Sequence, residues 1–249
     1  MAGWPGSGGT RIAMWSGPRN ISTALLRSWG SRADTVVCDE PLYAHYLEAT
    51  GAAHPGREEV IAAGETDWRR VVARLAGPVP EGKAIFFQKH MAHHLLPGMA
   101  GEWLLRLESF LLIRDPREML TSLVRVTPAP RLTDTGLPQQ RDLVGWLRER
   151  TGRTPAVVDA KDLLDAPASV LERLCGALRV PFDRAMLAWE AGPRATDGVW
   201  APHWYAEVVK STGFRAHAPK PESVPGRLAD LYETCLEIYR GLHALRIAA

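Results

Sequence analysis

The sequence predicts a three-layer α/β/α fold with a mainly parallel central sheet. The chain has 249 residues, a length that suits one α/β domain with a sizeable buried core. Short apolar runs rich in Val, Ile, Leu and Phe alternate with segments of helical periodicity, which is typical of βαβ units. In parallel sheets of this kind, ligands bind at the carboxyl ends of the strands. We therefore expect one domain over residues 11–249, with its site at that edge of the sheet.

The predicted strands are buried apolar runs that each end in a polar or charged residue. They are Arg11–Ser16, Thr35–Asp39, Ala84–Gln88, Phe110–Arg114 and Ala156–Asp159. Helical spacing of apolar residues predicts the helices that lie between and after these strands. They are Ile21–Ser31, Trp68–Leu75, Pro116–Val126, Gln139–Glu149, Ala168–Leu178 and Pro225–Leu245.

Four further segments have a distinct composition. Met1–Thr10 is rich in Gly and Ser and predicts a flexible leader. Thr127–Gln140 predicts a mobile loop near the site, and residues 195–225 predict a loop with one short helix, which could form a substrate lid. The apolar positions of Pro225–Leu245 predict either internal packing or an oligomer face, so a homodimer stays open.

Composition excludes several classes of protein. The net charge of +2 gives no broad basic field for nucleic acid. No stretch approaches the roughly 18 apolar residues of a membrane span. Cys38, Cys175 and Cys235 are far apart and odd in number, which argues against disulfides or a zinc site. We expect a cytoplasmic protein without nucleic-acid or membrane partners.

The segment after the first predicted strand, Gly17-Pro18-Arg19-Asn20-Ile21-Ser22-Thr23, predicts a phosphate-binding loop. Gly17 would allow a tight turn with positive φ. The N–H groups and dipole of the following helix favour an anion, to which Arg19 adds charge and Ser22 and Thr23 add hydroxyl donors. An ordinary helix cap is the alternative. The GxxxxGK[ST] motif is absent, so the loop lacks the usual lysine for γ-phosphoryl transfer.

A second phosphate site is predicted where the fourth strand ends at Arg114. Pro116 suits the first position of a helix, because its missing N–H costs nothing there. Ser122 lies two turns further on, on a face that could look back toward Arg114. A surface ion pair of Arg114 is the alternative.

These motifs resemble those of the sulfotransferases that use 3′-phosphoadenosine 5′-phosphosulfate (PAPS). Pro18–Thr23 is similar to the family's 5′-phosphosulfate loop, usually Pro-Lys-Ser-Gly-Thr-Thr. Arg114 and Ser122, eight positions apart, resemble its 3′-phosphate motif, and Asp162–Asp183 resembles a later segment that often reads EDL…DP…L..I..FLG.PFD. The resemblance covers most of Arg11–Asp183 in the expected order. It implies a P-loop fold of the sulfotransferase and nucleotide kinase type.

The resemblance also implies a donor and a reaction. The loop Gly17–Thr23 would hold the 5′-phosphosulfate through its backbone and through the side chains of Arg19, Ser22 and Thr23. Arg114 and Ser122 would hold the 3′-phosphate. The donor would be PAPS and the product 3′-phosphoadenosine 5′-phosphate (PAP), with no metal required. The sulfuryl group would pass to a hydroxyl or amine of a small-molecule acceptor.

Two residues are candidates for the base that takes the acceptor proton. Glu40 follows the second strand and resembles a glutamate base of some family members, although Asp39 and Glu40 could instead cap the helix after Pro41. His90 follows the third strand, where other members carry Lys-Thr-His. We expect Lys89 to stabilise the leaving group, while His90 stays either a base or a substrate contact. The spacing leaves two alignments with Lys-Thr-His open. Matching His90 to the family's histidine places Gln88 at the lysine, whereas matching Lys89 to the lysine places Met91 at the histidine.

Several alternatives concern residues around this site. His90, His93 and His94 could form a metal site, but no HExxH pattern or nearby cysteine supports one. Trp200, His203, Trp204 and Tyr205 could wall an acceptor pocket or simply pack. Lys210–Arg215 is a basic stretch that could touch the 3′-phosphate.

Two other functions stay open. One is a P-loop small-molecule kinase that uses Mg-ATP with Asp39 or Glu40 as base, against which the missing Walker lysine counts. The other is a non-catalytic nucleotide-binding protein, because Ile21 replaces a glycine of the family loop and Ala24 stands where some members place a tryptophan.

Overall fold

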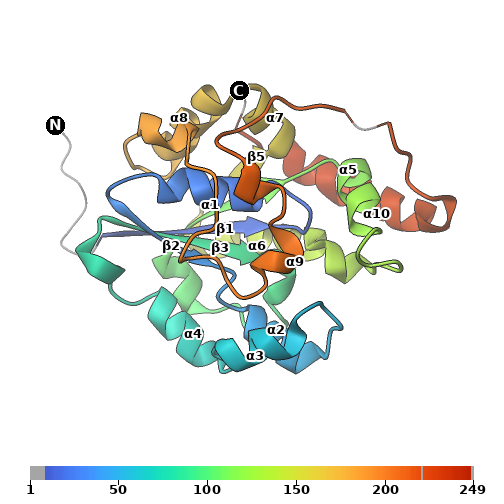
Figure 1. Cartoon of the computed structure of the whole chain (residues 1–249), viewed down its shortest axis with the longest axis horizontal. Coiled ribbons are helices and arrows are strands. Elements are labelled where there is room, and N and C mark those ends of the chain that lie inside the picture. Colours follow the sequence, from blue (N-terminus) through green and yellow to red (C-terminus); the bar gives the residue numbers. More distant parts are fainter. Residues whose placement is uncertain (1–8, 220, 248–249) are drawn as a thin grey trace.

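The computed structural model describes residues 9–219 and 221–247 of the chain. Its centre is a five-stranded parallel sheet in the order β2-β3-β1-β4-β5 (Figure 1). The strands are β1 (Thr10–Ser16), β2 (Thr35–Asp39), β3 (Ile85–Met91), β4 (Glu108–Ile113) and β5 (Ala156–Asp159). The predicted α/β/α class with a parallel sheet is confirmed. Residues 1–8 of the expected leader lie outside the described residues.

Helices cover both faces of the sheet, with α1 and α8 on one side and α3 and α4 on the other (Figure 1). The α-helices are α1 (Ser22–Gly30), α2 (Tyr43–Thr50), α3 (Arg57–Ala63), α4 (Trp68–Leu75), α5 (Pro116–Leu123), α6 (Leu137–Thr151), α7 (Ala160–Asp165), α8 (Pro167–Ala177), α9 (Ala201–Trp204) and α10 (Ala229–His243).

The two sides of β1 form different cores, because successive side chains of a strand point to opposite faces. Ile12 and Met14 pack in a cluster that includes side chains of α1 and α8. Ala13 and Trp15 pack in a second cluster with side chains of α5, α6 and α10. All four side chains are fully buried, which explains why the first strand reads as a continuous apolar run.

The strand register brings the carboxyl ends together. Asp39, the last residue of β2, lies opposite Lys89 of β3. Ser16, the last residue of β1, lies opposite Met91 of β3 and Leu112 of β4. The loops that follow these strands therefore meet at one edge of the sheet, as predicted.

Some predicted boundaries are wrong. β3 does not end at Gln88 but runs to Met91, so Lys89 and His90 lie within the strand. The helices α3 and α7 were not predicted. α7 has only six residues, too few for a periodic pattern, and begins because the Asp159 carboxylate accepts hydrogen bonds from the N–H groups of Lys161 and Asp162.

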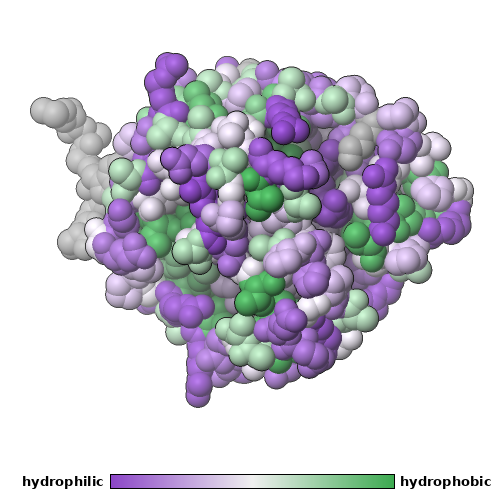
Figure 2. All heavy atoms as spheres, in the orientation of Figure 1, coloured by the Kyte–Doolittle hydropathy of each residue, from purple (hydrophilic) through white to green (hydrophobic). Residues whose placement is uncertain are grey.

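The apolar side of the last helix, α10, packs inside the chain. Cys235, Ile238 and Leu242 are buried in the same cluster as Trp15. The face of the molecule in Figure 2 is largely hydrophilic, with apolar residues in separate small patches. Within residues 9–219 and 221–247, no helix combines the length and apolar character needed to cross a membrane.

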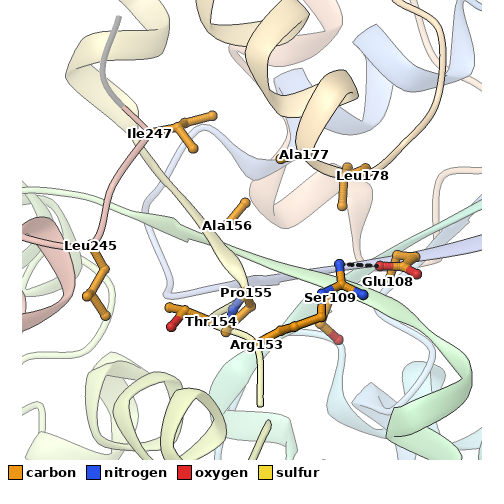
Figure 3. A pocket seen from close by; sticks show the side chains of 10 residues that line it. All are labelled: Glu108, Ser109, Arg153, Thr154, Pro155, Ala156, Ala177, Leu178, Leu245 and Ile247. Carbon is orange, nitrogen blue, oxygen red and sulfur yellow. Dashed lines mark ion pairs between the residues drawn. The ribbon is translucent and has the colours of Figure 1, made fainter. Parts of the chain in front are cut away.

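A cavity of about 230 Å³ lies at the opposite, amino-terminal edge of the sheet (Figure 3). It is lined by the first residues of β4 and β5 and by Leu245 and Ile247, and an Arg153–Glu108 ion pair of 3.7 Å crosses one wall. None of the predicted site residues lines it.

Candidate active site

The loop between β1 and α1 presents the amino end of a helix to the site. Ile21 precedes α1, and no side chain caps the helix there. The N–H groups of the first turn, including those of Ser22 and Thr23, have no partner within the helix and are available to an anion. Asn20 ties the loop down instead: its Nδ2 donates to the Leu112 carbonyl at 3.0 Å, and its Oδ1 accepts from Ile21 N–H at 2.9 Å.

The reason that sequence analysis gave for Gly17 is wrong. The left-handed residue of the loop is Arg19, with φ of 55°, and Gly17 does not adopt positive φ. Gly17 is needed because a Cβ there would lie 2.6 Å from the carbonyl oxygen of Thr135. Thr135 belongs to the segment 127–140, whose Gln140 also donates to the Trp15 carbonyl at 2.8 Å. This segment, whose residues from Leu137 onward belong to α6 and not to a loop, therefore lies against the loop Gly17–Thr23.

Replacing Gly17 with alanine should destabilise the protein by about 1–3 kcal/mol, the usual cost of overpacking a tight contact. The clash is with backbone, so no side-chain rotation relieves it. Urea unfolding measures the change. Gly145→Ala is the matched control, because that glycine lies in α6 with nothing within 4 Å of the new Cβ and alanine should stabilise the helix by about 0.5–1 kcal/mol. Equal stability of the two variants would contradict the close-approach explanation.

The Arg19 side chain joins the two predicted phosphate sites. Its Nε donates to Ser122 Oγ at 2.9 Å, and its carbonyl accepts from Arg114 at 2.8 Å. Arg19 of the predicted 5′ site and Ser122 of the predicted 3′ site are therefore in direct contact. Burial and the nearby cations Arg114 and Arg125 lower the pKa of Arg19. Such crowding of cations favours an anion between them.

Arg114 is held by a carboxylate on α5. Its Nε and one terminal nitrogen donate to the same Glu118 oxygen at 3.0 and 2.8 Å. His217 lies 2.6 Å from the other Glu118 oxygen. Burial raises the pKa of Glu118, but hydrogen bonds from Arg114 and His217 outweigh burial and hold this pKa below its ordinary value. The alternative prediction was a surface ion pair of Arg114. Arg114 does form an ion pair, with Glu118, but this pair is largely buried and lies at the end of β4 beside Arg19.

A buried cluster of charges lies at the carboxyl ends of β2 and β3. Lys89 Nζ donates to Asp39 Oδ1 at 2.7 Å and to Glu40 Oε1 at 2.5 Å. The Lys89 side chain is 1% exposed, whereas that of Glu40 is 12% exposed. Neither carboxylate caps the next helix, because α2 begins after Leu42 without a side-chain cap. The capping alternative is therefore wrong.

The surroundings shift the pKa values of both Glu40 and Lys89. Burial raises the pKa of Glu40 above its ordinary value, although the Lys89 ammonium opposes the shift. Burial lowers the pKa of Lys89, but attraction to Asp39 and Glu40 outweighs it and leaves the pKa well above the ordinary value. Lys89 is therefore a permanent cation, while Glu40 is a stronger base than an exposed glutamate.

His90 points to the other face of the sheet from its neighbour Lys89. Its ring stacks on Trp15 with centroids 4.3 Å apart, and its Nε2 lies 3.2 Å from Gln88 Oε1. Burial lowers the pKa of His90 to about 3, with a further effect of Lys89. Gln88 donates to the Leu75 carbonyl at 2.9 Å. Of Gln88, Lys89 and His90, only Lys89 has a described side-chain contact with Glu40.

His93 and His94 lie in a 3-10 turn after β3 and not on a helical face. The His94 ring stacks with both Tyr43 and Tyr46, with centroids 4.8 and 4.6 Å away. Among the residues that the structure describes, no group of three or more His, Cys, Asp or Glu side chains could hold a metal ion.

The segment predicted as a lid contacts the site at three points. Asp197 pairs with Arg27 of α1 at 2.8 Å, Tyr205 contacts Lys89 at 3.0 Å, and His217 contacts Glu118. Tyr205 was predicted only as a pocket wall or packing residue, and no role was predicted for His217. The basic stretch Lys210–Arg215 lies beside Trp189, whose backbone N–H donates to the Thr212 carbonyl at 3.0 Å. Its contact with the 3′-phosphate stays a prediction.

Comparison with known proteins now identifies the family. A sequence model of the sulfotransferase domain matches residues 10–246. The chain belongs to the sulfotransferase domain family. The predicted family membership is thereby confirmed. The match includes the loop Gly17–Thr23, the Arg19–Arg114 contact and the Lys89 cluster of this sulfotransferase domain.

Two curated relatives come from Arabidopsis thaliana. The sulfotransferase domain is 39% identical to branched-chain-amino-acid aminotransferase-like protein 1 over 233 residues, and 38% identical to the like-named protein 2 over 228 residues. These alignments cover 94% and 92% of this chain but only 41% and 40% of the relatives. The chain thus spans about two fifths of the length of the curated relatives it matches.

Two solved structures share the fold of this sulfotransferase domain. The sulfotransferase domain from the curacin biosynthetic pathway has a TM-score of 0.53 at 17% identity, covering 97% of this chain and 99% of the other. A sulfotransferase from Alicyclobacillus acidocaldarius has a TM-score of 0.57 at 12% identity, covering 96% and 97%. At these identities the likeness concerns the fold alone.

Proposed function

We propose that this protein transfers a sulfuryl group from PAPS to a hydroxyl or amine of a small-molecule acceptor. The observation that carries the proposal is the joined cationic site at the ends of β1 and β4. There the uncapped start of α1 lies beside Arg19, which contacts both Ser122 and Arg114. A donor with phosphates at both ends of its ribose matches two adjoining anion sites of this kind.

Each part of the proposed donor site rests on a separate feature. The N–H groups of Ser22 and Thr23 at the start of α1 would hold the 5′-phosphosulfate. The guanidinium of Arg114 and the Ser122 hydroxyl would hold the 3′-phosphate, and Arg19 would contribute charge to both. Ile21 does not oppose this, because its side chain packs against the hydrophobic core.

Glu40 is the proposed base. Its Oε1 accepts from Lys89, and no group in the described part of the chain bonds to its Oε2. PAPS supplies an activated sulfuryl group when bound. The acceptor oxygen or nitrogen forms a bond to sulfur as the bond from sulfur to the phosphate oxygen breaks, and the acceptor proton passes to Glu40 Oε2. The buried His90 has no such opening, since it is 1% exposed.

Lys89 would act on this reaction through its charge. Its three N–H donors are all engaged, by Asp39, Glu40 and Tyr205. In this arrangement it orients the Glu40 carboxylate and places a permanent positive charge at the strand ends, where the leaving phosphate gains negative charge. We also propose a cytoplasmic location, which suits the free thiols of Cys38, Cys175 and Cys235.

The test of donor binding uses Arg114→Ala. We expect PAP to bind about 10- to 100-fold more weakly to this variant, because charge-assisted hydrogen bonds contribute about 1.5–3 kcal/mol. The affinity for 5′-AMP, which lacks the 3′-phosphate, should stay unchanged. Calorimetric titration measures both affinities.

Arg150→Ala is the control, since Arg150 is a half-exposed arginine whose only described ion pair is a 3.5 Å contact with Glu102. Equal losses for PAP and 5′-AMP would contradict the assignment of Arg114 to the 3′-phosphate. Magnesium-dependent ATP binding without PAP binding would favour the kinase instead. Denaturation curves of each variant show whether the fold is kept.

A further inference from the structure

A tyrosine from the C-terminal part of the chain reaches the charged cluster. Tyr205 follows α9, far in sequence from β2 and β3, and it is 4% exposed. Its hydroxyl donates a short hydrogen bond to Asp39 Oδ2 and accepts from Lys89 at 3.0 Å. Trp200 Nε1 also donates to this hydroxyl, at 3.1 Å. Asp39 and Lys89 are thus bridged by one phenol as well as by their own ion pair.

Resting on the proposed function, we infer that Tyr205 is a positioning residue that directs Lys89 toward Glu40. The phenol does not reach Glu40 itself in any described contact. It acts by satisfying one oxygen of Asp39 and one proton of Lys89, which leaves the remaining Lys89 donor for Glu40 Oε1.

The hydrogen-bond count supports this role. An ammonium has three donors, and Lys89 directs them to Asp39 Oδ1, Glu40 Oε1 and Tyr205. An aspartate carboxylate without the phenol would keep one buried oxygen unsatisfied and would attract the ammonium to both its oxygens. Lys89 would then move toward Asp39 and away from Glu40. The basicity and orientation of Glu40 are therefore set in part by a residue of the predicted lid.

The phenol also ties the lid to this cluster. The same segment pairs through Asp197 with Arg27, whose side chains are 6% and 4% exposed. Docking of the segment therefore places the Tyr205 hydroxyl, and Trp200 fixes its orientation from the same segment. Because Tyr205 makes no described contact with Arg19, Arg114 or Ser122, its effect should fall on the chemical step and not on nucleotide affinity.

The test is Tyr205→Phe, which keeps the ring and removes the hydroxyl. We expect kcat to fall about 10- to 100-fold, the range for loss of a hydrogen bond to a charged group, with PAP affinity unchanged. The charged and titratable groups around Glu40 are Asp39 of β2, Lys89 of β3, Tyr43 of α2 and Tyr205. With Lys89 drawn to Asp39, the titration of the Glu40 carboxyl, followed by ¹³C NMR, should move to higher pH. The acidic limb of kcat/KM should move with it.

The chain offers a matched control at another strand end. Tyr239 donates to Asp159 Oδ2 at 2.8 Å, and Asp159 ends β5 as Asp39 ends β2. Tyr239→Phe removes the same kind of bond without touching Lys89, so it should leave kcat and the Glu40 titration unchanged. Trp200→Phe removes the donor to the phenol and also shortens a ring that packs edge-on against Tyr43, with centroids 5.3 Å apart. It should act as Tyr205→Phe does but more weakly, and it serves if Tyr205→Phe fails to fold.

The outcomes separate this inference from the proposed function. An unchanged Glu40 titration in folded Tyr205→Phe, or an equal shift in Tyr239→Phe, would overturn the positioning role even if the wild-type protein transfers sulfuryl groups. Failure of the wild-type protein to bind PAP would overturn the proposed function, while the NMR titration would still report on Tyr205.

Discussion

Glu40→Gln should lower kcat for sulfuryl transfer by about 100- to 10,000-fold, the usual contribution of a positioned base. Glutamine keeps the shape and can still accept a hydrogen bond from Lys89, so the loss would reflect the missing proton acceptor. PAP affinity should stay unchanged, because Glu40 makes no described contact with Arg19, Arg114 or Ser122. Steady-state kinetics and calorimetric titration on the same preparation measure the two quantities.

Two further variants complete this experiment. Glu48→Gln on α2 changes an exposed glutamate and should have no effect. His90→Gln tests the other candidate base. It should lower stability, since it removes a ring stacked on Trp15, but should leave kcat within a few-fold of the wild type. Full activity of Glu40→Gln together with loss of activity in folded His90→Gln would contradict the assignment.

Acidification from pH 7.5 to 5.5 should destabilise the fold by roughly 4 kcal/mol. Burial lowers the pKa values of His90 and His93 to about 3 and that of His94 well below its ordinary value. The unfolded chain binds protons at these histidines below a pH of about 6.5 and the folded chain does not, so stability is full above that pH and falls as the pH drops toward the folded pKa values. Each histidine then contributes about 1.4 kcal/mol per pH unit.

Urea unfolding at several pH values measures this effect. The slope below pH 6.5 should correspond to an uptake of about three protons on unfolding, increased by His54, whose pKa burial also lowers. Glu40, whose pKa burial raises, opposes the trend, because as the pH falls the folded chain takes up this proton before the unfolded chain does. His93→Asn should remove about one proton from the slope. Equal stability at pH 5.5 and 7.5 would contradict the buried neutral state of these rings.

The sequence was sufficient to predict the fold class and the edge of the sheet that carries the candidate site. Parallel strands must present their carboxyl ends on one side, so Arg114 after β4 and the Gly17–Thr23 loop after β1 had to converge there. The convergence of Asp39 with Lys89 depended on the strand order, which places β2 beside β3. The periodicity of a single apolar run predicts neither the order of the strands in the sheet nor their register.

The features that sequence analysis missed depend on contacts between distant segments. Gly17 is required because the Thr135 carbonyl leaves no room for a Cβ. The sequence predicted a positive φ at Gly17 instead, because nothing near Gly17 in the sequence indicates that Thr135 lies against it. Tyr205 and His217 lie in a segment without periodicity, and their roles follow from contacts with Asp39 and Glu118. The aromatic residues of Trp200–Tyr205 indicated that this segment is ordered. They did not indicate that Tyr205 contacts Asp39 and Lys89.

The bridge from Tyr205 to the strand ends has a consequence for synthesis of the protein on the ribosome. Asp39, Glu40 and Lys89 emerge long before Tyr205, which completes their hydrogen bonds. Until then the nascent sheet must keep this lysine and its carboxylates hydrated, because burying them with an unsatisfied bond would be costly. The carboxyl ends of β2 and β3 should therefore stay open to water during translation and close last, when the segment around Trp200 arrives.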